Sequence, residues 1–140
     1  MAKNVDNPAG VPAPPPGRYA HVNSVDVGDS TLLFLSGQCS VDDDLNVVAP
    51  HDVRGQSERI FEITTAILAA HGATWADVVN IRTYMTDLGK RAEYGEVRRR
   101  YLLADQLPTS TTVEVSALFL AEAVIEVEVM AVVTRRAGER

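Results

Sequence analysis

Two β-rich runs near the C-terminus carry the strongest structural signal: Pro-Thr-Ser-Thr-Thr-Val-Glu-Val at residues 108–115 and Val-Ile-Glu-Val-Glu-Val-Met-Ala-Val-Val at residues 124–133. Both alternate with a period of two and are rich in β-branched residues, which is typical of strands with one face on a core. In the second run the odd-numbered positions form an apolar face: Ile125, Val127, Val129, Ala131 and Val133. The even-numbered face carries two carboxylates, Glu126 and Glu128. Because an isolated buried charge is costly, either that face is hydrated or its acids have a function.

Length and composition are those of an ordinary globular domain. A chain of 140 residues predicts one domain with its own hydrophobic core. No apolar run reaches the ~20 residues that span a bilayer, and the N-terminus lacks a secretory signal pattern, so we expect a cytoplasmic protein with no membrane partner. One cysteine, Cys39, excludes an internal disulfide, and the aspartates at residues 42–44 lack calcium-loop spacing, so no metal site is predicted. A formal charge of −6 disfavours binding to nucleic acid, which would require a basic face.

The rest of the chain divides into a tail and one domain. Residues 1–16 contain five of the seven prolines and are predicted to be a flexible tail. The domain is expected to extend from residue 17 to residue 136, with a short tail at residues 137–140. Its other predicted strands cover residues 18–27, 31–36 and 78–86, and its predicted helices cover residues 53–71 and 91–104. The first helix has an apolar stripe at helical spacing, Asp52 as its N-cap, and Gly72 at the position that ends a helix.

The order of these elements is ββαβαββ, which predicts an α+β fold. Such an order favours a two-layer sandwich, with a mixed sheet and both helices on one of its faces. The uncovered face would combine apolar with polar side chains: Val124, Met130 and Val132 beside Thr112, Glu114, Glu126 and Glu128. A homo-oligomer would bury such a face and leave its polar groups in clefts between subunits. Ligand sites tend to form in clefts of that kind.

Five motifs in this order resemble the Rid family (YjgF/YER057c/UK-type reactive intermediate deaminases). The first is Gly-Arg-Tyr-Ala-His at residues 17–21, and the second is Leu-Ser-Gly-Gln at residues 35–38 with Val-Asp at residues 41–42. The third begins with Asp52 and Gln56 and ends with Gly-Ala at residues 72–73. The fourth joins Asp-Val-Val at residues 77–79 to Thr-Tyr-Met-Thr-Asp-Leu at residues 83–88. The two C-terminal runs form the fifth, and the order and spacing of all five make the resemblance specific.

The resemblance implies a chorismate-mutase-like fold, a homotrimer, and small-molecule ligands in clefts between subunits. Archetypal members hydrolyse imines and enamines released by pyridoxal-phosphate enzymes, giving a 2-oxo acid and ammonia, without a metal or cofactor of their own. The family residues carried over are Tyr19 in the pocket wall, Ser36 and Gly37 at a strand end, and Thr112 at a small polar position. Glu126 is carried over as the acid that would position or activate water.

Two positions depart from the family pattern. The archetypal signature is Pro-Ala-Arg-Ser-Thr, whose arginine pairs with the substrate carboxylate, and that arginine position is Ser110 here. A serine cannot form the bidentate, charge-assisted pair that arginine forms. The asparagine of the family's second helix falls at Gly95. The expected substrate is therefore a small imine or enamine other than a simple 2-imino acid, unless another group such as Arg18 or Arg82 replaces the arginine.

Glu126 is the predicted catalytic residue. One carboxylate in a partly apolar cleft could direct water at the carbon of a C=N bond and then protonate the nitrogen. Glu114 and Glu128 are competing acids, and all three could instead be hydrated or paired with an arginine such as Arg82. The residues expected to bind substrate are Tyr19, Ser36, Gly37, Ser110, Thr112 and Glu114.

Several alternatives stay open. His21 lies two residues from Tyr19 and is either a surface residue or a further acid–base group. Cys39 follows the strand-end motif and is either incidental or a nucleophile, although no partner base can be named from spacing. Besides hydrolysis, another water- or proton-transfer step such as tautomerisation or cyclisation also stays open. The chain could also be a trimer that binds a small molecule or a partner protein without turnover. A ribonuclease is disfavoured by the acidic charge and by the lack of a His/Lys/Arg cluster.

Overall fold

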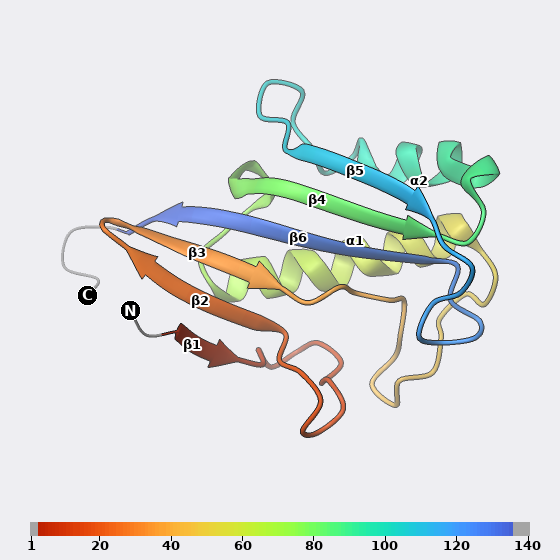
Figure 1. Cartoon of the computed structure of the whole chain (residues 1–140), viewed down its shortest axis with the longest axis horizontal. Coiled ribbons are helices and arrows are strands. Elements are labelled where there is room, and N and C mark those ends of the chain that lie inside the picture. The colour runs from red at the N-terminus through yellow and green to blue at the C-terminus, as the bar shows by residue number, and fades with distance from the viewer. Residues whose placement is uncertain (1–2, 136–140) are drawn as a thin grey trace.

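A computed structural model describes residues 3–135 (Figure 1). Its helices and strands follow in the order β1 (Lys3–Asp6), β2 (Val22–Val27), β3 (Ser30–Leu35), α1 (Val53–Ala70), β4 (Val78–Met85), α2 (Arg91–Arg98), β5 (Thr109–Glu114) and β6 (Ile125–Thr134). Two short 3₁₀ helices, Trp75–Asp77 and Leu88–Lys90, precede β4 and α2. No helix within residues 3–135 combines the length and hydropathy needed to cross a membrane.

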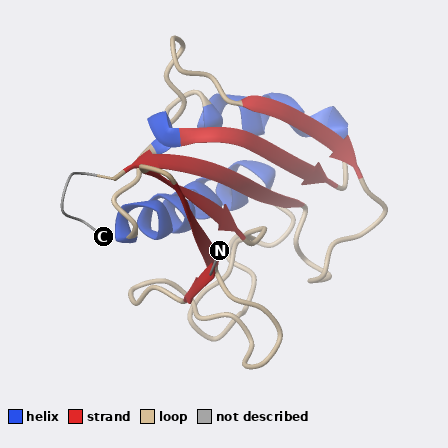
Figure 2. Ribbon diagram, turned by 60° about the vertical axis from the view of Figure 1, so that its left-hand side comes forward, coloured by secondary structure: helices blue, strands red, loops and turns tan. Residues whose placement is uncertain are grey.

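The strands form one mixed sheet in the order β1-β2-β3-β6-β4-β5. Neighbouring strands are antiparallel except β4 and β5, which are parallel and connected through α2. Both helices lie on the same face of the sheet (Figure 2). The predicted α+β sandwich with a mixed sheet and two helices on one face is therefore confirmed, with β1 as an additional edge strand.

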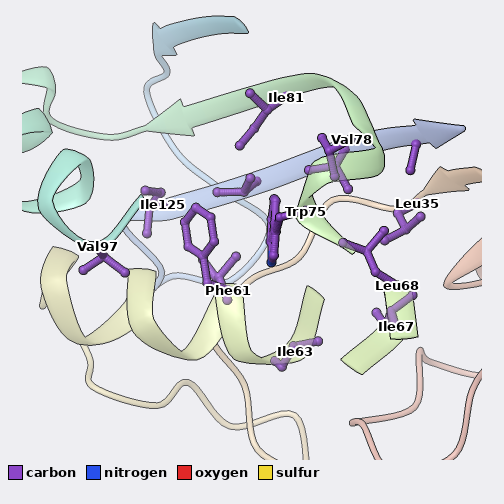
Figure 3. Packing of buried hydrophobic residues seen from close by; sticks show 14 of the residues in the cluster. Leu35, Phe61, Ile63, Ile67, Leu68, Trp75, Val78, Ile81, Val97 and Ile125 are labelled. Carbon is purple, nitrogen blue, oxygen red and sulfur yellow. The ribbon is translucent and has the colours of Figure 1, made fainter. Parts of the chain in front are cut away.

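The hydrophobic core lies between the helices and β6, as the alternation in the second C-terminal run predicts. Ile125, Val127, Val129 and Ala131 are buried, and they meet the apolar stripe of α1 (Figure 3). Burying one such aliphatic side chain stabilises the fold by roughly 1.5–3 kcal/mol. An aromatic cluster closes the end of the core near α2, where the ring of Phe61 lies 4.8 Å from that of Trp75 and 4.9 Å from that of Tyr101.

The helix boundaries follow local signals at α1 but not at α2. Gly72 adopts a left-handed conformation (φ 71°) just after α1, and its N–H donates to the carbonyl of Ala69. Asp52 occupies the N-cap, although its side chain makes no capping hydrogen bond. The second helix ends at Arg98 rather than at residue 104, because the chain continues in tighter turns that direct Tyr101 onto Phe61.

The N-terminal segment differs from the flexible tail predicted for residues 1–16. β1 pairs with β2, and Pro12 and Pro14 are buried. The imidazole of His21 donates from Nε2 to the carbonyl of Pro12 at 2.6 Å, and its backbone N–H donates to Asn7 at 2.9 Å. Proline lacks an N–H but keeps its carbonyl acceptor, which explains how a proline-rich segment packs here. The tail predicted for residues 137–140 lies outside the described residues.

The register of β5 corrects one prediction from the sequence. Thr112 lies opposite Thr83 and Glu114 lies opposite Met85 on β4, and both β4 residues are buried on the helix side of the sheet. Thr112 and Glu114 therefore do not share the uncovered face with Glu126. All six residues of β5 are exposed, so the alternation within the strand does not reveal which of its side chains lie on the helix side of the sheet and which lie on the uncovered face.

Candidate functional site

A pocket of about 290 Å³ opens where β3 ends beside β6. It lies on the open face, meaning the sheet face opposite α1 and α2, from which Glu126 projects. Three segments far apart in the sequence form its walls: residues 12–15, residues 36–39 and the loop that precedes β6. Glu126 is the only residue of β6 that lines it.

A bulge at the end of β3 shapes the floor of this pocket. Phe34 pairs with Met130, and the next pairing joins Gln38 to Val127, so four residues of one strand match three of the other. The extra residue falls in the Ser36-Gly37 stretch, where such bulges redirect side chains. The Ser36 hydroxyl donates to the carbonyl of Ala20 at 2.6 Å, which ties the bulge to the segment before β2.

Glu126 lies directly against this bulge. A Cβ atom on Gly37 would lie 2.7 Å from Oε2 of Glu126, closer than carbon and oxygen normally approach. The thiol of Cys39 donates to Oε1 of the same carboxylate, with an Sγ–Oε1 distance of 3.3 Å. The carboxylate is therefore positioned by a glycine that leaves room for one oxygen and a thiol that contacts the other.

The neighbours of Glu126 are proton-bearing groups. Burial raises the pKa of the Cys39 thiol far above its usual range, and the charge and hydrogen bond of Glu126 add to that effect. The pKa of the Tyr19 phenol is also raised, first by burial and then by Cys39 and Glu126. At neutral pH both groups therefore keep their protons, and the Cys39 thiol donates its proton in a hydrogen bond to the Glu126 carboxylate.

His21 is neither a surface residue nor a free acid–base group. The side chain is buried, and Nε2 lies 2.6 Å from the carbonyl of Pro12 while Nδ1 lies 3.3 Å from the amide nitrogen of Gln38. This network assigns the proton to Nε2, because a carbonyl can only accept and the amide nitrogen can only donate. His21 thus connects the N-terminal segment to the end of β3 and holds two walls of the pocket together.

The predicted site residues fall into two groups. Tyr19, Ser36, Gly37 and Glu126 all line the pocket. Ser110, Thr112 and Glu114 lie on β5, which is separated from β6 by β4 and forms the opposite edge of the sheet from β1 (Figure 1). Within one chain, the structure does not bring the second group to Glu126.

The two competing acids have other partners. Glu128 accepts a hydrogen bond of 2.5 Å from the Tyr84 hydroxyl and lies opposite Arg82 in the sheet. Glu114 accepts from the backbone N–H of Leu88 at 3.0 Å, at the start of a 3₁₀ helix. Of the three candidate acids, only Glu126 lines the pocket.

The sequence patterns did not predict the apolar residues of the pocket wall. Phe119 and Leu120 line the pocket from the loop before β6, and Phe119 is 76% exposed. The Leu-Phe-Leu run at residues 118–120 was a usable signal, because a run of that kind is unusual in a connection between strands. Pro12 and Pro14 were missed because the proline-rich segment was interpreted as a tail.

Among residues 3–135, no cluster of three or more His, Cys, Asp or Glu side chains has the arrangement of a metal site. Within residues 3–135, no lysine or arginine lines the pocket. The chemical resources of the site are accordingly one carboxylate, the hydroxyl, thiol and phenol groups around it, and an apolar wall.

Comparison with known proteins gives one consistent family. Residues 12–133 match the family model described as Endoribonuclease L-PSP. Protein DfrA of Myxococcus xanthus is 40% identical over 102 residues, which cover 73% of this chain and 76% of that protein. TdcF of Escherichia coli strain K12, whose full name is 'Putative reactive intermediate deaminase TdcF', is 31% identical over 114 residues, which cover 80% of this chain and 85% of that protein. The crystal structure of YyfA from Yersinia pestis, described as a protein of unknown function of the conserved Rid family, superimposes with a TM-score of 0.82 and 26% identity over 94% of this chain and 100% of that one.

Proposed function

The chain belongs to the endoribonuclease L-PSP family, which includes the Rid (YjgF) proteins, and from that premise we propose that it hydrolyses a small reactive imine or enamine. The observation that carries this proposal is the placement of Glu126, whose carboxylate lies in a partly apolar pocket against Gly37 and Cys39. The name of TdcF supports the reaction class.

The reaction consumes one water molecule. Starting from a protonated imine, Glu126 accepts a proton from the water that attacks the carbon of the C=N bond, which gives a neutral carbinolamine. Glu126 then passes this proton to the nitrogen, the C–N bond breaks, and ammonia or an amine leaves. The hydroxyl of the carbinolamine gives its proton to Glu126 as the carbonyl forms, and Glu126 releases that proton to solvent. Tyr19 lines the same pocket and can donate a hydrogen bond to the oxygen that develops negative charge.

A homotrimer would complete the pocket. The open face of a single chain leaves Phe34 38% exposed, with Met130 and Val132 half-buried beside it, and a second subunit would cover these side chains. The exposed edge strand β5 is then available to a neighbouring pocket. In this arrangement the edge strand that carries Ser110 and Thr112 in one subunit would lie beside the Glu126 pocket of another, whereas β4 separates β5 from β6 within one chain.

The substrate would not be a simple 2-imino acid. Such a substrate carries a carboxylate, and the described pocket offers that group no lysine or arginine. Ser110 stands where the family pattern has the arginine that would come from the edge strand. A carboxylate brought close to Glu126 without a cation would be repelled, because two like charges in a partly apolar cleft cannot both be accommodated.

A coupled deaminase assay tests this substrate argument. A pyridoxal-phosphate dehydratase would generate 2-aminoacrylate, and release of the 2-oxo acid would be followed with the wild-type chain and with Ser110→Arg. We expect no acceleration by the wild type and a gain of activity by Ser110→Arg. Clear wild-type activity would show that the missing arginine is replaced from elsewhere.

This assay, together with a measurement of RNA binding, separates hydrolysis from the two other functions considered. If neither the wild-type chain nor Ser110→Arg accelerates release of the 2-oxo acid, the result would favour a trimer that binds a small molecule or partner without turnover, or a different water- or proton-transfer step. A ribonuclease would show RNA binding that weakens steeply with salt. We expect essentially none, because the formal charge is −6.

A further inference from the structure

The charge of the pocket is unbalanced. Among the described residues that line it, Glu126 is the only Asp, Glu, Lys or Arg, and the imidazole of His21 has both ring nitrogens engaged in hydrogen bonds. The only hydrogen bond to its carboxylate from another side chain within the described residues comes from the Cys39 thiol, which is a weak donor. A partly buried carboxylate with so little compensation is stabilised when a cation binds beside it.

The rest of the pocket favours an apolar body. Apolar residues make up most of the lining beyond Glu126, among them Val41, Leu45, Phe119 and Leu120. Phe119 is 76% exposed, more than any other large hydrophobic residue that the structure describes. Its ring therefore makes few contacts within the chain and can pack against a ligand without losing them. The volume of about 290 Å³ is at the small end of ligand pockets, which hold about 300–1,000 Å³.

We propose that this pocket binds a protonated imine or amine on an apolar, carboxylate-free body, with the cationic nitrogen beside Glu126 and the body against Phe119 and Leu120. This inference rests on the proposed function and specifies its substrate class as arylalkyl or bulky alkyl imines. The amine that corresponds to the imine is a stable mimic, because it carries the same positive nitrogen but cannot be hydrolysed.

Three probes of similar size test the charge preference: benzylamine, which is protonated at neutral pH, benzyl alcohol, which is neutral, and benzoate, which is an anion. Their affinities for the full chain would be measured by calorimetry at low ionic strength. We expect benzylamine to bind at least ~10-fold more tightly than benzyl alcohol, which corresponds to about 1.4 kcal/mol, and benzoate not to bind. Equal or tighter binding of benzoate would overturn the proposal.

Matched variants assign the preference to named residues. Glu126→Gln keeps the shape of the side chain and should remove the ~10-fold advantage of benzylamine over benzyl alcohol. Glu128→Gln alters a carboxylate on the same strand face but outside the pocket, and should leave that advantage intact. Phe119→Ser should weaken benzylamine and benzyl alcohol alike. An unchanged preference in Glu126→Gln would contradict the proposal, provided that circular dichroism shows both glutamine variants folded.

This readout is independent of turnover, so the two proposals can fail separately. Selective binding of benzylamine without hydrolysis of any imine would support the charge preference and contradict the enzymatic function. Hydrolysis of imines without any preference for benzylamine would support the enzymatic function and contradict the charge preference.

Discussion

The carboxylate of Glu126 occupies the space that a side chain at residue 37 would fill. A Cβ on Gly37 would lie 2.7 Å from Oε2 of Glu126 and 3.0 Å from its Cδ. The atoms that would be displaced belong to the flexible end of a side chain, whereas the backbone around Gly37 is fixed by the pairing of Gln38 with Val127. Residue 37 therefore controls the position of the acid more than the stability of the sheet.

Gly37→Ala should separate function from stability. The added methyl group would push the carboxylate away from the pocket floor, so we expect at least a ~10-fold loss of benzylamine affinity, while the free energy of unfolding falls by only about 1 kcal/mol. Calorimetry and urea unfolding would measure the two quantities. Full affinity in the alanine variant would show that the close approach of Gly37 and Glu126 has no part in binding.

Cys39 should react slowly with alkylating agents. Its raised pKa means that the thiolate, which is the reactive form, is scarce at pH 8 and that the rate keeps rising beyond pH 9. The chain has one cysteine, so iodoacetamide labelling followed by mass spectrometry reports on this residue alone. We expect a rate at least ~10-fold below that of the urea-unfolded chain.

The same measurement on Glu126→Gln isolates the carboxylate. Burial would remain, but the negative charge beside the thiol would be gone, so the pKa of Cys39 should fall and its alkylation rate should increase. Glu128→Gln serves as the control and should leave the rate unchanged. Identical rates in wild type and Glu126→Gln would show that the contact between Sγ and Oε1 does not form in solution.

Gln56 should be important for stability and for the shape of the pocket wall. It is fully buried in α1, donates to the carbonyls of Ala49 and Glu122, and accepts from the backbone N–H of Val124. Gln56→Leu would leave the N–H of Val124 without this acceptor and would remove one of the two hydrogen bonds that each carbonyl accepts, so we expect a loss of roughly 3 kcal/mol in the free energy of unfolding.

Urea unfolding would measure that loss, with Glu58→Ala on the exposed side of α1 as a control that changes stability by less than about 0.5 kcal/mol. A loss below 1 kcal/mol in Gln56→Leu would mean that the loop before β6 is not anchored by this side chain. The loop carries Phe119, so its release should also weaken benzylamine binding.

The fold was predictable because its main signals are local. The alternation of Ile125, Val127 and Val129 with two glutamates identifies the buried face of β6 without any knowledge of its neighbours, and the confirmed core follows from it. Gly72 likewise ends α1 through its own backbone conformation. Glu126 could be assigned to the open face for the same reason.

Other features depend on partners that lie far away in the sequence. The face of Thr112 depends on its register with Thr83, because both sides of β5 are exposed. The packing of the proline-rich segment depends on a hydrogen bond from His21 to the carbonyl of Pro12. Neither pairing leaves a periodic pattern in the sequence, and the approach of Cys39 to Glu126 across 87 positions does not either.

Hydrolysis of a carboxylate-free imine by Glu126 tests the central claim most directly. A flavin amine oxidase would generate the imine of benzylamine in the presence of semicarbazide, which reacts faster with the imine than with the benzaldehyde that hydrolysis releases. The measured quantity is the initial rate of semicarbazone formation, with wild type, Glu126→Gln and Glu128→Gln compared at equal concentration. We predict that wild type and Glu128→Gln lower this rate by removing the imine, and that the catalysed rate of hydrolysis falls about 100-fold or more in Glu126→Gln. Equal protection by Glu126→Gln, or no protection by the wild type, would contradict the account.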